Sequence, residues 1–142
     1  HEILKKKVPL VRSMDDYVNC PHSRNTEVRL EDILKHPELE VLAKSDEAGV
    51  LLVLNEYGSG SQVFIQGHPE YDRMTLSNEY HRDVEKGLNP ALPKNYFTDN
   101  NPFSRPVLCW RNFSNTLYAN WLNFYVYQNT PYELSNNFDW VI

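Results

Sequence analysis

The sequence predicts an α/β fold in which several strands come before two helices along the chain. Apolar segments of strand length lie at 38–45, 49–54 and 62–66, and apolar residues at helical spacing follow at 73–87 and 112–128. This change from short apolar runs to helical periodicity is typical of chains that pack helices on a sheet. One strand-to-helix unit is too few to fix the strand order, so the sheet topology stays open at this stage.

Composition narrows the class of protein. The chain has 142 residues, 41% of them hydrophobic and 13% aromatic, which is enough for one domain with a packed core. The net charge is −5, with a single basic block at Lys5–Lys7 and no apolar run of membrane-spanning length, so we expect neither nucleic-acid nor membrane binding. Two cysteines make no disulfide framework, and reduced thiols in a cytoplasmic protein are expected.

The first two-thirds of the chain contain the predicted strands. Residues 1–30 alternate short apolar groups with turn residues and predict irregular structure with short strands. The segment 38–45 alternates as a half-buried strand does. The apolar runs 49–54 and 62–66 are separated by a glycine-serine turn at 57–61, so they should form a hairpin or neighbouring strands.

The rest of the chain contains the predicted helices. In 73–87, the residues Leu76, Tyr80 and Val84 share one helical face, Asp72 is a candidate N-cap, and Gly87 occupies the place of a C-terminal glycine. A long proline-rich loop should follow at 88–109. The final helix, 112–128, has apolar residues around most of its circumference and is expected to be largely buried.

The strongest candidate site lies where the 62–66 strand ends, at Gly67-His68-Pro69-Glu70. In an extended segment, residues i and i+2 project to the same side, so the carboxylate of Glu70 should reach the imidazole of His68. Such a carboxylate would fix the tautomer of the imidazole and stabilise its protonated form. The alternative is a solvated surface turn, because His36-Pro37-Glu38 has the same pattern before a strand rather than after one.

Other reactive side chains are weaker candidates. Arg82 would either form an exposed ion pair with Glu79 or hold a substrate carboxylate, and the residues alone favour the ion pair. Ser23 lacks a nucleophile elbow, which leaves a polar contact to a ligand or an ordinary loop serine. The cysteines and histidines lack zinc-ligand spacing, so no metal site is expected. Cys109 opens a helix but is expected to be a packing residue.

Several segments together resemble the homoserine O-acyltransferase family, whose members have the class I glutamine amidotransferase-like fold. The similarity extends over essentially the whole chain in register, which makes it far more specific than any single tripeptide. It is carried by Pro21-His22-Ser23-Arg24, Gly67-His68-Pro69-Glu70-Tyr71-Asp72, Arg82-Asp83-Val84-Glu85-Lys86-Gly87-Leu88, Asn95-Tyr96-Phe97 and the run from Trp110 to Tyr132.

The resemblance implies a fold and an activity. Residues 1–142 would be the C-terminal half of a single acyltransferase domain, part of a flavodoxin-like three-layer sheet without its N-terminal half. Such enzymes move an acyl group from succinyl-CoA or acetyl-CoA, as co-substrate, to the hydroxyl of L-homoserine in methionine biosynthesis, through a cysteine thioester and without a bound cofactor. By resemblance, His68 is the general base, Glu70 is its partner, and Ser23 and Arg82 contact the substrate, with Arg82 on its carboxylate.

One departure from the family pattern matters. The family's nucleophilic cysteine, a substrate-binding lysine and the position linked to donor choice lie in the N-terminal half, and Cys109-Trp110 aligns with a different stretch. The chain also begins at His1 rather than Met, so we expect the gene product to extend upstream. We therefore expect this chain alone to be inactive and to expose apolar surface that its missing half covers. A homodimer is plausible for the complete enzyme, and the donor stays open. An amidotransferase-type hydrolase and a non-catalytic binding module are the alternatives.

Overall fold

The computed structural model describes residues 1–56 and 60–128. Its sheet has four antiparallel strands in the order β1-β2-β3-β4. The strands are β1 (Glu2–Ile3), β2 (Glu40–Ser45), β3 (Gly49–Asn55) and β4 (Gln62–Ile65). The helices are α1 (Leu30–Ile33), α2 (Thr75–Glu85) and α3 (Arg111–Asn120), which continues as the π-helix Trp121–Val126; 3-10 turns lie at Pro9–Val11 and Thr98–Asn100.

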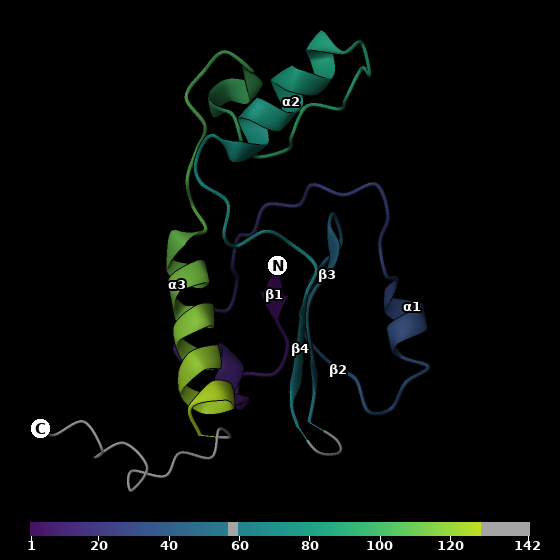
Figure 1. Ribbon diagram of the computed structural model, residues 1–142, viewed down its shortest axis with the longest axis vertical. Helices are drawn as coiled ribbons and strands as arrows, with labels where there is room; N and C mark the ends of the chain where they lie inside the picture. Colours follow the sequence, from purple (N-terminus) through teal and green to yellow (C-terminus); the bar gives the residue numbers. More distant parts are fainter. Residues whose placement is uncertain (57–59, 129–142) are drawn as a thin grey trace, which may run out of the picture.

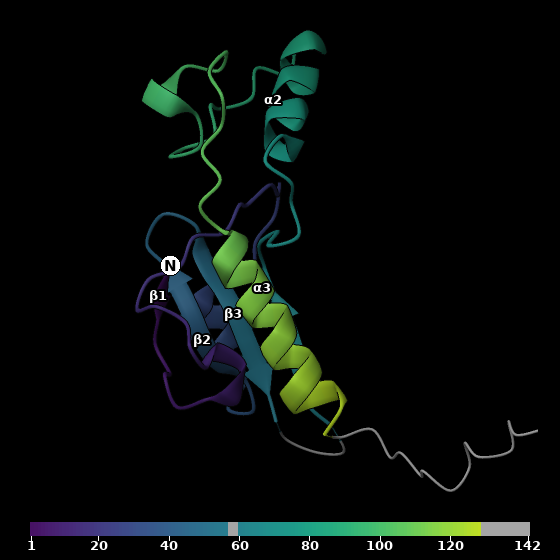
Figure 2. The same ribbon diagram turned by 90° about the vertical axis from the view of Figure 1, so that its left-hand side faces the viewer.

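Strand β3 is the buried centre of the sheet. It pairs with β2 from Glu40↔Leu54 to Ser45↔Gly49 and with β4 from Leu52↔Ile65 to Asn55↔Gln62. Helix α3 covers one face of the sheet and the short α1 lies on the other (Figures 1 and 2). Both faces of β3 are therefore packed, which explains why its sequence is continuously apolar rather than alternating.

Two hydrophobic clusters of the sheet correspond to these two faces. Leu42, Leu51 and Leu54 pack with Phe113 and Leu117 of α3. On the other side, the cluster around α1 consists of Ile33, Val41, Val50 and Val53. The cluster beneath α3 also takes in the buried residues of the N-terminal segment, so the irregular residues before β2 are part of this core.

A second lobe, residues 71–110, stands away from the sheet. Figure 1 shows α2 and the loop after it joined to the rest of the chain by two crossings, one leaving β4 and one entering α3. This α2 lobe has its own core, formed by Tyr96, Phe97 and Trp110 with Tyr71, Leu76, Tyr80, Leu92 and Leu108 packed against them. The remaining described residues, 1–56, 60–70 and 111–128, form the sheet lobe.

Most of the predicted elements are confirmed, with corrections at their ends. The three longer strands and the two long helices lie where the periodicity placed them, and Gly87 (φ 72°) follows the C-cap of α2. The prediction of Asp72 as the N-cap is wrong. The N-cap of α2 is Met74, and Asp72 accepts the N–H of Thr75 with its backbone carbonyl oxygen at 3.2 Å, while its carboxylate lies 3.7 Å from Arg111. The sequence also gave no indication of the single-turn helix α1.

The expectation for the last helix holds only for its first half. Phe113 and Leu117 are buried, whereas Trp121 is 39% and Leu122 37% exposed. The predicted turn at 57–61 falls partly outside the described residues. Every paired strand of the described sheet is antiparallel, which agrees with an α/β protein only at the level of class. Within the described ranges, no helix has the length and hydrophobicity to cross a membrane.

Candidate active site

The predicted contact between His68 and Glu70 is present. Nδ1 of His68 lies 2.8 Å from Oε1 of Glu70. The backbone N–H of His68 donates to the carbonyl oxygen of Pro21 at 2.8 Å, and its Nε2 lies 3.3 Å from the carbonyl oxygen of Ser23. A carboxylate on Nδ1 leaves Nε2 as the nitrogen that can exchange a proton with a substrate. The geometry is thus that of an oriented base, and the catalytic role stays a prediction.

The second His-Pro-Glu tripeptide, His36-Pro37-Glu38, allows a comparison with His68-Pro69-Glu70 within the same chain. His36 and Glu38 approach to 3.4 Å between Nδ1 and Oε1, with both side chains largely exposed. The His-Pro-Glu pattern therefore favours the contact by itself, as the i and i+2 argument requires. What distinguishes His68 is the contact of its backbone and its second ring nitrogen with the segment Pro21–Ser23, together with a ring stacked on the imidazole.

That stacked ring belongs to Tyr71, which the sequence had not singled out. The centroids of His68 and Tyr71 are 4.3 Å apart and the rings are 15° from parallel. The hydroxyl of Tyr71 donates to Oε1 of Glu79 in α2 at 2.8 Å. Burial, followed by the hydrogen bond to Glu79, raises the pKa of Tyr71 to about 12, while a hydrogen bond with the Ser23 side chain opposes this rise. Tyr71 is therefore a neutral hydrogen-bond donor at physiological pH.

Glu79 contributes a second feature to this side of the site. Its other carboxylate oxygen, Oε2, is buried and has no hydrogen-bond partner among the described residues. Buried polar atoms are rarely left unsatisfied, because burial removes them from water without a compensating bond. An unsatisfied carboxylate oxygen beside a candidate base is a position where a cationic or hydrogen-donating ligand group would be stabilised.

The structure places the other predicted site residues at different distances from the base. Ser23 lies next to His68 and Tyr71. The sequence favoured an ion pair between Arg82 and Glu79, but Arg82 pairs with Asp83 instead. Its Nε donates to Oδ1 of Asp83 at 2.8 Å, and its side chain is 55% exposed. That hydrogen bond is the first cause of a raised Arg82 pKa, to which the charge of Glu79 also contributes.

Arg24 fixes the segment that holds His68, a role that sequence reasoning missed. Its guanidinium donates to the carbonyl oxygens of Gln66 (3.3 Å) and Ala48, and it contacts Nδ1 of His22 at 3.0 Å. Burial first, and then the charge of Arg24, lower the pKa of His22 to about 4, so His22 is neutral at pH 7. One side chain therefore joins the β2–β3 turn, the end of β4 and the segment before Ser23.

Neither cysteine has the environment of an activated thiol. Burial, followed by the charge of Glu70, raises the pKa of Cys20 to about 12. Burial also raises the pKa of the Cys109 thiol, although Cys109 lies near the start of α3. A nucleophilic cysteine needs the opposite shift, because the thiolate is the reactive form. The Cys109 side chain is nevertheless exposed, so the expectation that it is a buried packing residue is wrong.

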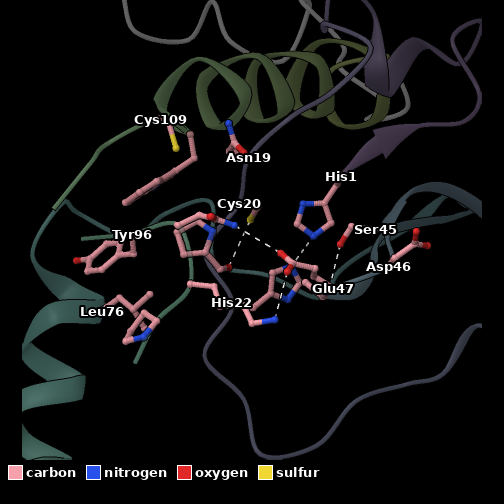
Figure 3. Close-up of a pocket in the computed structure, with 16 residues that line it drawn as sticks. His1, Asn19, Cys20, His22, Ser45, Asp46, Glu47, Leu76, Tyr96 and Cys109 are labelled. Carbon is pink, nitrogen blue, oxygen red and sulfur yellow. Dashed lines mark hydrogen bonds and ion pairs between the residues drawn. The ribbon is translucent and has the colours of Figure 1, made fainter. Parts of the chain in front are cut away.

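A cavity of about 430 Å³ lies between the two lobes (Figure 3). Cys20, Pro21 and His22 line it from the sheet lobe, and Tyr96 and Trp110 from the α2 lobe. Lys94 and Glu47 also line the cavity and join the lobes through an ion pair of 3.2 Å. Pro21, which accepts the N–H of His68, is thus part of the cavity wall. Across the described ranges, no group of three or more His, Cys, Asp or Glu side chains is arranged to hold a metal ion.

Comparison with known proteins points to one family. The profile of the family described as homoserine O-succinyltransferase matches residues 1–132. A protein of Agathobacter rectalis named homoserine O-acetyltransferase is 56% identical over 137 residues, which is 96% of this chain and 44% of that protein. Proteins of the same name from Thermotoga neapolitana and Lachnospira eligens are 52% and 50% identical, with 44% of each covered. The chain thus spans less than half the length of these relatives.

Proposed function

Because this chain belongs to the homoserine O-succinyltransferase family, we propose that it supplies the general base and the amino-acid subsite for acyl transfer from an acyl-CoA to the hydroxyl of L-homoserine. The observation that supports this most directly is the 2.8 Å contact between His68 Nδ1 and Glu70. It orients the imidazole as the base of a covalent acyl-transfer mechanism requires.

In this mechanism the base acts twice. His68 Nε2 first takes the proton of a cysteine thiol, whose sulfur attacks the thioester carbonyl of acyl-CoA, and CoA leaves with that proton. His68 then takes the proton of the homoserine hydroxyl, whose oxygen attacks the acyl-enzyme, and the cysteine sulfur regains the proton as it leaves. Glu70 stabilises the imidazolium at both stages.

The nucleophilic thiol would come from the part of the parent protein that the chain does not include. Both cysteines of the chain have raised thiol pKa values, which is the wrong direction for a nucleophile. The relatives are more than twice as long as the region matched here, which leaves room for such a segment. We propose that the missing part also completes the three-layer, class I glutamine amidotransferase-like sheet.

Recognition of the amino acid is assigned to α2. Arg82 would bind the substrate carboxylate through its guanidinium group, because a guanidinium matches a carboxylate in two parallel hydrogen bonds. The unsatisfied Oε2 of Glu79 would accept the α-ammonium group, and Ser23 would contact the substrate beside the base. A cation and an anion one helical turn apart match the two charges of an amino acid.

The test is CoA release by the complete parent protein, with L-homoserine and either succinyl-CoA or acetyl-CoA. Homoserine-dependent release with one donor, lost in His68→Ala, would support the proposal and identify the donor, which the differing names of the family and its relatives leave open. We expect this chain alone to release none. Ammonia release from glutamine without acyl transfer would favour a hydrolase, and neither reaction would favour a binding module.

A further inference from the structure

The Tyr71 side chain touches both halves of the proposed site. Its ring stacks on the imidazole of His68 at 4.3 Å, and its hydroxyl donates to Glu79 at 2.8 Å. It also lies at the start of the crossing from β4 into α2, directly between the catalytic segment and the helix that carries Glu79 and Arg82.

The two contacts have separable effects. A ring stacked nearly parallel to the imidazole restricts rotation of the imidazole about the Cβ–Cγ bond of His68. This restraint complements the hydrogen bond to Glu70. The hydroxyl occupies one oxygen of Glu79 and leaves the other, Oε2, without a partner. A carboxylate whose first oxygen is fixed presents its second oxygen in one direction, so less side-chain freedom is lost when a ligand binds there.

We propose that Tyr71 is a positioning residue that couples the amino-acid subsite to the base: its ring orients the His68 imidazole, and its hydroxyl orients the Glu79 carboxylate. This inference rests on the proposed function. It adds Tyr71 as a residue that acts through His68 and Glu79. The backbone supports the same arrangement, because the carbonyl oxygen of Tyr71 accepts the indole N–H of Trp110 at 2.9 Å, which fixes the start of the crossing.

The experiment measures the two half-reactions separately in the complete parent protein. The first is the burst of CoA release from acyl-CoA without homoserine, which needs the base but not the amino-acid subsite. The second is the KM for L-homoserine in steady-state turnover. The variants are Tyr71→Phe, which keeps the ring, Tyr71→Leu, which removes it, and Glu79→Gln. Tyr80→Phe is the control, because it removes a tyrosine hydroxyl from α2, the helix that carries Glu79, while keeping the ring packed near His81 and Phe97.

The expected pattern separates ring from hydroxyl. Tyr71→Phe should raise the KM for homoserine roughly tenfold, the effect of losing a hydrogen bond to a charged acceptor, and leave the burst within about twofold of wild type. Tyr71→Leu should also slow the burst by about two- to tenfold, the range of an aromatic stacking contact. Because the hydroxyl acts through Glu79, Tyr71→Phe combined with Glu79→Gln should be no worse than Glu79→Gln alone. Tyr80→Phe should match wild type.

Two results would overturn the coupling while acyl transfer by the wild-type parent remained intact. One is an unchanged homoserine KM in Tyr71→Phe, and the other is a burst slowed equally by Phe and Leu. A well-folded wild-type parent that releases no CoA from either donor would instead overturn the proposed function, and the coupling with it. A faster burst in Tyr71→Phe than in Tyr71→Leu would show that the ring orients the base. A general loss of folding would slow the burst in both variants.

Discussion

Replacement of Gly67 by alanine should damage the site through a single methyl group. A Cβ built on Gly67 would lie 2.7 Å from Sγ of Cys20, 2.9 Å from the carbonyl oxygen of Pro21 and 3.0 Å from Cδ1 of Leu51. Non-bonded carbon contacts are ordinarily near 3.5–4.0 Å, so all three are too close. The Pro21 oxygen belongs to the backbone and also accepts the N–H of His68, so it cannot retreat without moving the candidate base.

The magnitude follows from these contacts. Overpacking a tightly packed site by a methyl group costs about 1–3 kcal/mol in free energy of unfolding, and two of the three obstacles are buried or part of the backbone. Relief by a shift of the 67–68 backbone would misplace the imidazole, and a misplacement of about 1 Å costs on the order of 100-fold in turnover. We therefore expect Gly67→Ala in the complete parent protein to lower both the urea midpoint and kcat.

Gly60→Ala is the matched control, because a Cβ at Gly60 meets nothing within 4 Å. Combining Gly67→Ala with Cys20→Ala should restore part of the lost stability by removing the closest contact, although the Pro21 oxygen stays in place. A Gly67→Ala protein with wild-type stability and turnover would refute the claim that close backbone approach positions His68. The claim would also be refuted if Gly60→Ala lost as much stability and turnover as Gly67→Ala.

Three further predictions test the roles of single side chains in the parent protein. Glu70→Gln should lower kcat by about 10- to 100-fold while substrate binding changes little, because the imidazolium loses its charged partner; unchanged kcat would exclude this role. Arg82→Ala should mainly raise the KM for L-homoserine. An equal rise in the KM for acyl-CoA would argue against a carboxylate clamp. Cys109→Ser should keep near wild-type turnover and acyl-enzyme formation, since its thiol pKa is raised; loss of the acyl-enzyme, followed by mass spectrometry, would identify it as the nucleophile instead.

Local patterns predicted the parts of the fold that local forces determine. The three longer strands, the two long helices and the glycine after α2 follow from apolar spacing and from the φ of 72° that Gly87 adopts. The N-cap prediction for α2 was wrong because Asp72 lies two residues before the observed cap and its carboxylate pairs with Arg111 instead of capping the helix. The prediction for the last helix was wrong in its second half for a different reason. An apolar surface indicates what a helix can bury, but after Leu117 only part of that surface is covered: Tyr125 packs against the cluster beneath α3, whereas Trp121 and Leu122 stay exposed.

The same distinction applies to the site. The contact of His68 with Glu70 was predictable because the two residues are neighbours in an extended segment, and the shared geometry of His36 and Glu38 shows how local that rule is. Arg24 bonds to Gln66 across 42 positions of the chain, a pairing that no spacing rule contains. Gly67 is not among the glycines with positive φ, so its backbone conformation does not require glycine. Its small size is needed because the Cys20–Pro21 backbone passes against it.

The two lobes divide the proposed reaction between base and substrate recognition, so the placement of one lobe on the other sets the geometry of transfer. Their cores are separate, and the lobes are connected by the two crossings (Figure 1) and by the ion pair between Lys94 and Glu47. Hydrogen bonds join the crossings to each other: Arg73 Nη1 donates to the carbonyl oxygen of Pro106 at 2.8 Å, and Trp110 Nε1 to that of Tyr71 at 2.9 Å. Because Tyr71 lies between these bonds and the imidazole, a shift of the α2 lobe would move the ring on His68 and the carboxylate of Glu79 together. In the proposed reaction, substrate recognition and base orientation would therefore be linked at Tyr71.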